Sequence, residues 1–260
     1  MSKLYNYMGV PAASEDRDFY DNYILTYHFD NTSQTWYSII RVNQTKLDGT
    51  KQFPFHRYTG YEDMKPPRVL RQEEPWNLII NCGWSGLEIE NSIVKRDFAA
   101  NMQDNICALT IDNRGTLGYA FGWEAGSGAT YVENGIVSAS TAFFPLLVNY
   151  RPFDIHSVAP EYQLDVPAQR QILGQWNNGD YAIITAEGRG YSNSTGFTLS
   201  RAIEICQNLG LKFAFNLDGG GSTQTVIGDK TINTIYEGTD GRPVPSFIVF
   251  NGTDEFFIPT

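Results

Sequence analysis

Residues 216–223 combine an acidic side chain, consecutive glycines and two hydroxyl groups in one short run, Asn-Leu-Asp-Gly-Gly-Gly-Ser-Thr. Consecutive glycines cost backbone entropy and pack nothing, so an ordered run of them needs a physical reason. One such reason is close approach of backbone N–H groups to a ligand, with a carboxylate from Asp218 and donors from Ser222 and Thr223. A flexible glycine turn is the alternative that these residues alone leave open. The glycines concerned are Gly219, Gly220 and Gly221.

This run differs from the phosphate-binding loops of nucleotide-binding proteins. No lysine follows the glycines, and residues 224–227 (Gln-Thr-Val-Ile) predict a strand where a P-loop needs a helix. The spacing also lacks the Gly-x-Gly-x-x-Gly pattern of a dinucleotide-binding turn. We therefore expect no cofactor.

Residue types that commonly bind metals are scattered along the chain. His28, His56 and His156 lie far apart and lack the HExxH spacing of a zinc enzyme, so we expect surface or packed histidines. The three cysteines are equally dispersed, and an odd count without a close pair gives neither a disulfide framework nor a zinc knuckle. The prediction is that the chain holds no metal.

The chain is acidic, with a formal net charge of −10 at pH 7 over 260 residues. A field of that sign repels polyanions, so we expect no nucleic-acid partner. A small anionic substrate remains compatible with this charge where a few arginines converge. No apolar run approaches the roughly 18 residues of a membrane helix, so no membrane partner is expected. The first ten residues lack a basic region followed by an apolar core, and we expect no signal peptide.

The elements that would position Asp218 are one clear helix and the strand after it. Thr198 or Ser200 caps a helix whose apolar stripe includes Cys206 and which ends at Gly210. The helix leads directly into residues 212–217, whose alternating large apolar side chains predict a strand with one buried face. Asp218 would then lie on the other side, at a rigid strand end.

Several short segments in the rest of the chain predict strands. The segments concerned are 23–29, 36–42, 77–82, 108–112, 118–121, 130–132 and 146–149. Residues 48–75 hold several prolines and glycines and predict a long loop. A helix feeding a strand within a strand-rich chain favours the α+β class, with a mixed or mainly antiparallel sheet core and a few helices. We expect an N-terminal arm over 1–20 and a single domain over 21–260.

The run NLDGGGSTQTVI at 216–227, followed by DGRPVPSFIVF at 240–250, resembles the end of the phosphodiester glycosidase family. Similar segments occur upstream in the family's order, so that the resemblance covers about residues 77–250. These segments are Asn81-Cys-Gly-Trp84, Gln169-Arg170-Gln171, Glu187-Gly188-Arg189 and Gly196-Phe-Thr-Leu199.

The resemblance implies hydrolysis of sugar-1-phosphodiesters at the glycosidic bond, with a carbohydrate phosphodiester as substrate. Such an enzyme must hold a phosphate, and a guanidinium fork matches phosphate geometry. It must also supply a carboxylate that activates water or stabilises an oxocarbenium-like transition state, for which Asp218 is the first candidate and Glu187 the second. The candidates for phosphate binding are Arg170, Arg189 and Arg242.

Three of these residues also allow a structural interpretation. Arg189 and Arg242 could form structural contacts, in the case of Arg242 a salt bridge. Asn81 could cap a turn or contact a sugar hydroxyl.

The resemblance and the expected lack of a signal peptide together fit a phage virion protein, because lysis releases such proteins without secretion. The partners would then be other virion proteins of the tail or baseplate, and the substrate a cell-wall or capsular glycopolymer. Outside that setting a cytoplasmic protein is expected. The competing hypothesis is a non-catalytic virion structural or glycan-binding protein that retains the fold.

Overall fold

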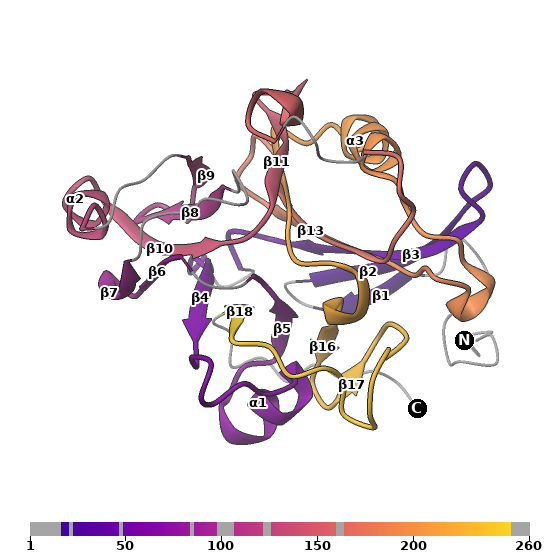
Figure 1. Cartoon of the computed structure of the whole chain (residues 1–260), viewed down its shortest axis with the longest axis horizontal. Helices are drawn as coiled ribbons and strands as arrows, with labels where there is room; N and C mark the ends of the chain where they lie inside the picture. Colours follow the sequence, from indigo (N-terminus) through magenta and orange to yellow (C-terminus); the bar gives the residue numbers. More distant parts are fainter. Residues whose placement is uncertain are drawn as a thin grey trace.

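The structure is a computed structural model that describes residues 17–20, 23–46, 49–83, 86–97, 107–121, 126–159 and 164–250. Its strands form three sheets, and every strand pair recorded among these residues is antiparallel. Short helices pack against the sheets: α1 contacts β5 and β16, α2 contacts β6, β7 and β10, and α3 contacts β11 (Figure 1). The α+β class with a mainly antiparallel core is confirmed.

The largest sheet has eight strands in the order β1-β2-β3-β14-β13-β15-β11-β12. The predicted strands at 23–29 and 36–42 are confirmed as β2 and β3, and β3 pairs with β14. Within the predicted arm, β1 pairs with β2, and residues 1–16 lie outside the described residues. The strand bounds are β1 Arg17–Tyr20, β2 Tyr23–Asp30, β3 Thr35–Val42, β11 Phe144–Val148, β12 Arg151–Pro152, β13 Arg170–Gln175, β14 Tyr181–Ala186 and β15 Phe213–Asn216.

Two five-stranded sheets complete the β-structure, in the orders β7-β6-β10-β8-β9 and β17-β16-β5-β18-β4. The second of them contains the strand that follows the glycine run, β16, paired with β5. Bounds in the first are β6 Leu87–Glu90, β7 Ile93–Asp97, β8 Ala108–Asp112, β9 Leu117–Ala120 and β10 Ile136–Thr141. Bounds in the second are β4 Pro54–Tyr58, β5 Leu78–Asn81, β16 Thr225–Ile227, β17 Lys230–Thr231 and β18 Ser246–Phe250.

The helices are α1 Pro67–Glu73, α2 Gly128–Glu133 and α3 Leu199–Asn208, with 3₁₀ turns at Ile155–Ser157, Tyr191–Asn193 and Gly220–Ser222. The predicted helix is confirmed as α3, and Thr198 is its cap because its Oγ1 accepts the Arg201 N–H at 3.0 Å. Gly210 takes φ +69° just beyond the helix end, the left-handed conformation that terminates helices. No helix in the described ranges is long and apolar enough to cross a membrane.

Two sequence predictions of local structure are wrong. Residues 48–75 contain β4, which gains a partner from distant β18, and α1, which begins at Pro67. Proline suits the first turn of a helix as well as a loop, so its presence does not exclude α1. Residues 130–132 belong to α2, where Tyr131 and Val132 pack against a small apolar cluster in place of forming a strand.

Strand β15 is buried along its whole length, on both faces. The expected contrast between a buried and an open face is therefore wrong. Its neighbours β13 and β11 satisfy its backbone. The side chains of Phe213, Ala214 and Phe215 belong to the largest apolar cluster of the core, as do Cys82 and Cys206. Asp218 becomes accessible because it lies beyond the end of the strand. The buried strand before it holds its backbone in a fixed position.

Replacement of Thr198 by Ala should lower the free energy of unfolding by about 1 kcal/mol, since the Arg201 N–H at the start of α3 loses its acceptor. Urea unfolding measures the effect. Ser200→Ala is the matched control, because the Ser200 hydroxyl contacts Asp165 at the surface and caps nothing. Equal losses in the two variants would contradict the assignment of Thr198 as the cap.

Candidate active site

Most of the predicted site residues line one open cleft of about 440 Å³, where β13 begins and β15 ends. Asp218 and the three glycines form part of its wall together with three arginines. Apolar side chains from Phe143, Val166 and Ala168 complete the lining. The predicted residues that line the cleft are Arg170, Arg189, Asp218, Gly219, Gly220, Gly221 and Arg242.

Two backbone contacts fix Asp218 beyond the end of β15. Its N–H donates to the Cys82 carbonyl at 2.7 Å, and its own carbonyl accepts the Asn81 Nδ2–H at 2.7 Å. The other end of the Asn81 amide, Oδ1, accepts the Gln224 N–H at 2.9 Å. Asn81 is 1% exposed and does not line the cleft. Its amide therefore connects both flanks of the glycine run, and we assign it to positioning rather than to sugar binding.

The glycine run allows the protein's own groups to approach its backbone. A Cβ on Gly219 would lie 2.7 Å from the Gln169 carbonyl oxygen, and one on Gly220 would lie 2.8 Å from Nη2 of Arg189. Gly220 also has φ +57°, which L side chains rarely adopt. A Cβ on Gly221 would lie 2.9 Å from Cζ of Arg242. Glycine at these positions thus brings two guanidinium groups against the turn.

Ser222 and Thr223 lie behind the cleft, since neither contributes to its lining and both are buried. The Ser222 hydroxyl bonds to the Asp218 carboxylate, whereas Oγ1 of Thr223 has no hydrogen-bond partner among the described residues. The prediction that both present donors to a ligand therefore needs correction. The 3₁₀ turn that begins at Gly220 carries Ser222 back toward Asp218.

The carboxylate of Asp218 is poised to change protonation near neutral pH. Burial raises the pKa of its carboxyl to about 6. The Ser222 hydroxyl, the Gly219 N–H and the Arg242 guanidinium stabilise the ionised form and oppose this rise. Asp218 is thus able to exchange a proton while remaining hydrogen-bonded.

Each of the arginines in the cleft is held by a different kind of contact. Arg170 is 6% exposed and donates from Nε to the Phe197 carbonyl at 3.0 Å and from Nη2 to the Val166 carbonyl at 2.8 Å. Arg242 forms an ion pair with Glu237 at 2.7 Å. Arg242 therefore combines the predicted structural salt bridge with a place in the cleft.

Tyr236 lies against both Arg189 and Arg242, and it was not identified as a site residue from the sequence. Its ring centroid lies 5.2 Å from Cζ of Arg189 and 5.7 Å from Cζ of Arg242, within the range of cation–π contacts. The only sequence signal is an aromatic residue six positions before Arg242. We infer that Tyr236 keeps two like charges close together.

Glu187 does not line the cleft. It lies beside a separate small cavity bordered by Trp36, Tyr37 and Asn233. Its Oε1 accepts the Thr234 N–H at 2.8 Å, and burial raises the pKa of its carboxyl to about 7. The geometry gives no support to its proposed catalytic role, because a substrate in the cleft would contact Asp218 and not this carboxyl.

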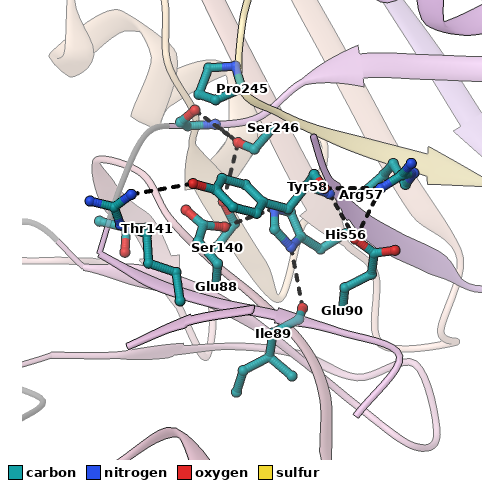
Figure 2. A network of polar contacts seen from close by, with 12 residues as sticks. His56, Arg57, Tyr58, Glu88, Ile89, Glu90, Ser140, Thr141, Pro245 and Ser246 are labelled. Atoms are coloured by element: carbon teal, nitrogen blue, oxygen red, sulfur yellow. Dashed lines mark hydrogen bonds and ion pairs between the residues drawn. The ribbon is translucent and has the colours of Figure 1, made fainter. Parts of the chain in front are cut away.

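A polar network fixes the turn at Cys82 and Gly83, where the Cys82 carbonyl accepts the Asp218 N–H (Figure 2). The Ser246 hydroxyl donates to the Gly83 carbonyl at 2.8 Å and accepts the Gly83 N–H at 3.0 Å, while the Ser246 carbonyl accepts the Cys82 N–H at 3.0 Å. A Cβ on Gly83 would lie 2.0 Å from the Thr141 carbonyl oxygen, so glycine is required there. The next residue of the family-like segment, Trp84, lies outside the described residues.

The same network contains a buried pair of ionisable side chains, His56 and Glu88. Nε2 of His56 lies 2.9 Å from Oε2 of Glu88, and the two side chains are 1% and 0% exposed. Figure 2 shows His56 between Glu88 and the Ile89 carbonyl, which Nδ1 contacts at 3.2 Å. Burial raises the pKa of Glu88, while His56 opposes the rise. His56 is thus packed inside the protein.

A model of the family described as phosphodiester glycosidase matches residues 72–251. The chain belongs to the phosphodiester glycosidase family. The match includes Asn81, the glycine run and the three arginines of the cleft. The resemblance found over about residues 77–250 is confirmed.

Proteins similar in sequence or fold come from distant sources. The SPbeta prophage-derived uncharacterized protein YomE of Bacillus subtilis (strain 168) is 28% identical over 209 residues, which cover 78% of this chain and 32% of that protein. The chain thus spans about a third of its relative. The catalytic domain of zebrafish N-acetylglucosamine-1-phosphodiester alpha-N-acetylglucosaminidase, auto-inhibited by its pro-peptide, matches with a TM-score of 0.67 and 16% identity, covering 89% of this chain and 82% of that one. A hypothetical protein from Synechocystis matches with a TM-score of 0.71 and 11% identity, covering 92% and 64%.

Replacement of Glu187 by Gln should stabilise the protein at pH 8 by about 1–3 kcal/mol and have little effect near pH 4. The carboxyl has a higher pKa in the folded chain than its ordinary 4.5, so the stability it contributes is complete below pH 4.5 and is lost as the pH rises through about 7. Gln keeps an acceptor for the Thr234 N–H and cannot ionise. Urea unfolding at both pH values measures the difference. The exposed Glu62→Gln is the control, and a gain for Glu187→Gln that does not change with pH would contradict the account.

Proposed function

We propose that the chain hydrolyses sugar-1-phosphodiesters at the bond between the anomeric carbon and the phosphate oxygen. The observation that carries this proposal is the convergence of one carboxylate, Asp218, with three arginines in a single cleft of the family's fold.

The arginines suit the charge of such a substrate. A phosphodiester carries one negative charge, and cleavage of the glycosidic bond adds a second to the departing phosphate monoester. Guanidinium groups bind phosphate oxygens through paired N–H donors. Because Arg170 is held by two carbonyls, it is already oriented before substrate binds. The arginines would thus stabilise the charge that develops as the bond breaks.

Asp218 would act in its ionised form. It accepts a proton from water while the water oxygen forms a bond to the anomeric carbon. The bond between C1 and the phosphate oxygen breaks at the same time, and its electron pair stays on that oxygen. Glycosidases with poorer leaving groups use a second carboxyl as acid. A phosphate monoester leaves as an anion already stabilised by arginine, so one carboxylate in the cleft is sufficient.

The natural substrate class would be cell-wall or capsular glycopolymers with sugar-1-phosphate linkages, in a phage setting. The prophage origin of one relative supports that setting. The same relationship also favours the second candidate, a non-catalytic virion structural or glycan-binding protein. A binder would retain sugar phosphodiesters without releasing sugar.

The test is release of N-acetylglucosamine from an α-GlcNAc-1-phosphate diester. Asp218→Asn should lower kcat by about 10²–10⁴-fold with a smaller change in KM, because it removes the proton acceptor. The kcat/KM of the unchanged protein should rise with pH through about 6, as Asp218 ionises. Asp229→Asn, an exposed change in the turn between β16 and β17 and outside the cleft, is the matched control. Folded Asp218→Asn within about tenfold of the unchanged protein would rule out its role as proton acceptor.

A further inference from the structure

A second and larger groove, of about 760 Å³, lies at the opposite end of the strands that form the cleft. Strand β13 begins at Arg170 in the cleft and ends at Gln175 in the groove, while β15 begins at Phe213 in the groove and leads to Asp218. Six extended residues span about 20 Å. The two sites are therefore separate but joined by rigid, buried strands.

Several polar side chains in this groove make no polar contact with the rest of the described structure. Within the described part of the chain, Asn149, Asn177 and Lys212 line the groove and their side chains form no hydrogen bond or ion pair. The groove floor, by contrast, is fixed: Gln175 accepts the Leu117 N–H at 3.0 Å and donates to the Gly115 carbonyl at 2.9 Å. Amide groups with both donors and acceptors available on a rigid floor suit a ligand rich in hydroxyl groups.

An aromatic side chain accompanies these amides. Tyr119 lines the groove, is 38% exposed and is held edge-on by Phe153 at a centroid distance of 5.4 Å. Its ring is thus oriented before any ligand binds. Rigid aromatic rings with a polar tip provide large contact areas at low entropic cost, which suits sugar rings.

The groove also differs in charge from the molecule as a whole. Its charged lining residues among those described are Arg114 and Lys212, without an acidic side chain, although the net charge of the chain is −10. Arg114 is already paired with Asp112, so Lys212 is the cation available to a ligand. A single ammonium group beside free amides fits a hydroxyl-rich ligand that carries occasional negative charges.

We propose that this groove is a second glycan-binding site, which holds a phosphate-bearing segment of a glycopolymer while another linkage of the same polymer occupies the cleft. The identity of the polymer rests on the proposed function. A chain bound at both sites gains affinity because its second contact is intramolecular. A substrate with one phosphodiester gains nothing from the groove.

The test compares two probes by calorimetry, a single α-GlcNAc-1-phosphate methyl diester and an oligomer of α-GlcNAc-1-phosphate long enough to span both sites. Binding is measured with the Asp218→Asn variant of the whole 260-residue chain, which should consume the probes about 10²–10⁴-fold more slowly if the proposed function holds. Adding Lys212→Gln and Asn177→Ala together should weaken oligomer binding by at least about 10-fold. Binding of the single diester should change by less than about twofold, since neither residue lines the cleft.

Hydrolysis of the single diester by Lys212→Gln/Asn177→Ala, with Asp218 intact, should equal that of the unchanged protein. Arg68→Gln, a partly exposed change on α1, is the matched control for lost positive charge. Unchanged oligomer affinity in the groove variant, or tighter binding of a single-stranded oligonucleotide than of the glycan oligomer, would overturn the proposal. If no sugar is released but oligomer binding still depends on Lys212 and Asn177, the proposed function fails and the groove assignment stands.

Discussion

The position of Asp218 depends on the backbone hydrogen bonds that fasten the end of β15 to the neighbouring β5 segment. The Asp218 N–H bonds to the Cys82 carbonyl and its carbonyl accepts from Asn81, so residues far apart in sequence fix one carboxylate. Because these groups are buried, loss of either contact would leave an unsatisfied polar group and move the carboxylate. The Ser246–Gly83 contacts extend the same constraint into the adjacent strand, β18. The position of Asp218 in the cleft is therefore set by contacts to its backbone.

The fixed position of the turn also determines which charged groups lie beside Asp218. A turn without Cβ atoms at Gly220 and Gly221 lets Arg189 and Arg242 pack against the backbone beside Asp218. Tyr236 contacts both guanidinium groups, which keeps like charges near each other in the absence of substrate. Binding of a phosphodiester would replace part of that stabilisation with direct ion pairs. The cleft thus has a localised positive wall although the chain as a whole is acidic.

The sequence predicted the parts of the site that lie close together along the chain. The helix cap, the following strand and the glycine run are contiguous, so propensities and spacing were sufficient for α3, β15 and the turn. The grouping of Arg170, Arg189 and Arg242 came from the family resemblance.

The sequence predictions that failed depend on how strands far apart in the chain align with one another. Whether the Asn81 amide meets a sugar or the Gln224 backbone depends on how β5 aligns with β16, and no local pattern encodes that alignment. The same holds for Glu187, which lies close in sequence to Arg189 yet lines a different cavity. Likewise β4 exists because β18 pairs with it, a partner almost two hundred residues away.

The central claim, that the cleft breaks a glycosidic bond and not a phosphate ester bond, is tested most directly by hydrolysis in ¹⁸O-water. Mass spectrometry of the phosphate monoester is the decisive reading, because the anomeric hydroxyl of the free sugar exchanges with water. Attack at the anomeric carbon predicts an unlabelled phosphate product, with the label entering the sugar at early times. A phosphate monoester that carries one ¹⁸O per turnover would contradict the account, since water would then have attacked phosphorus.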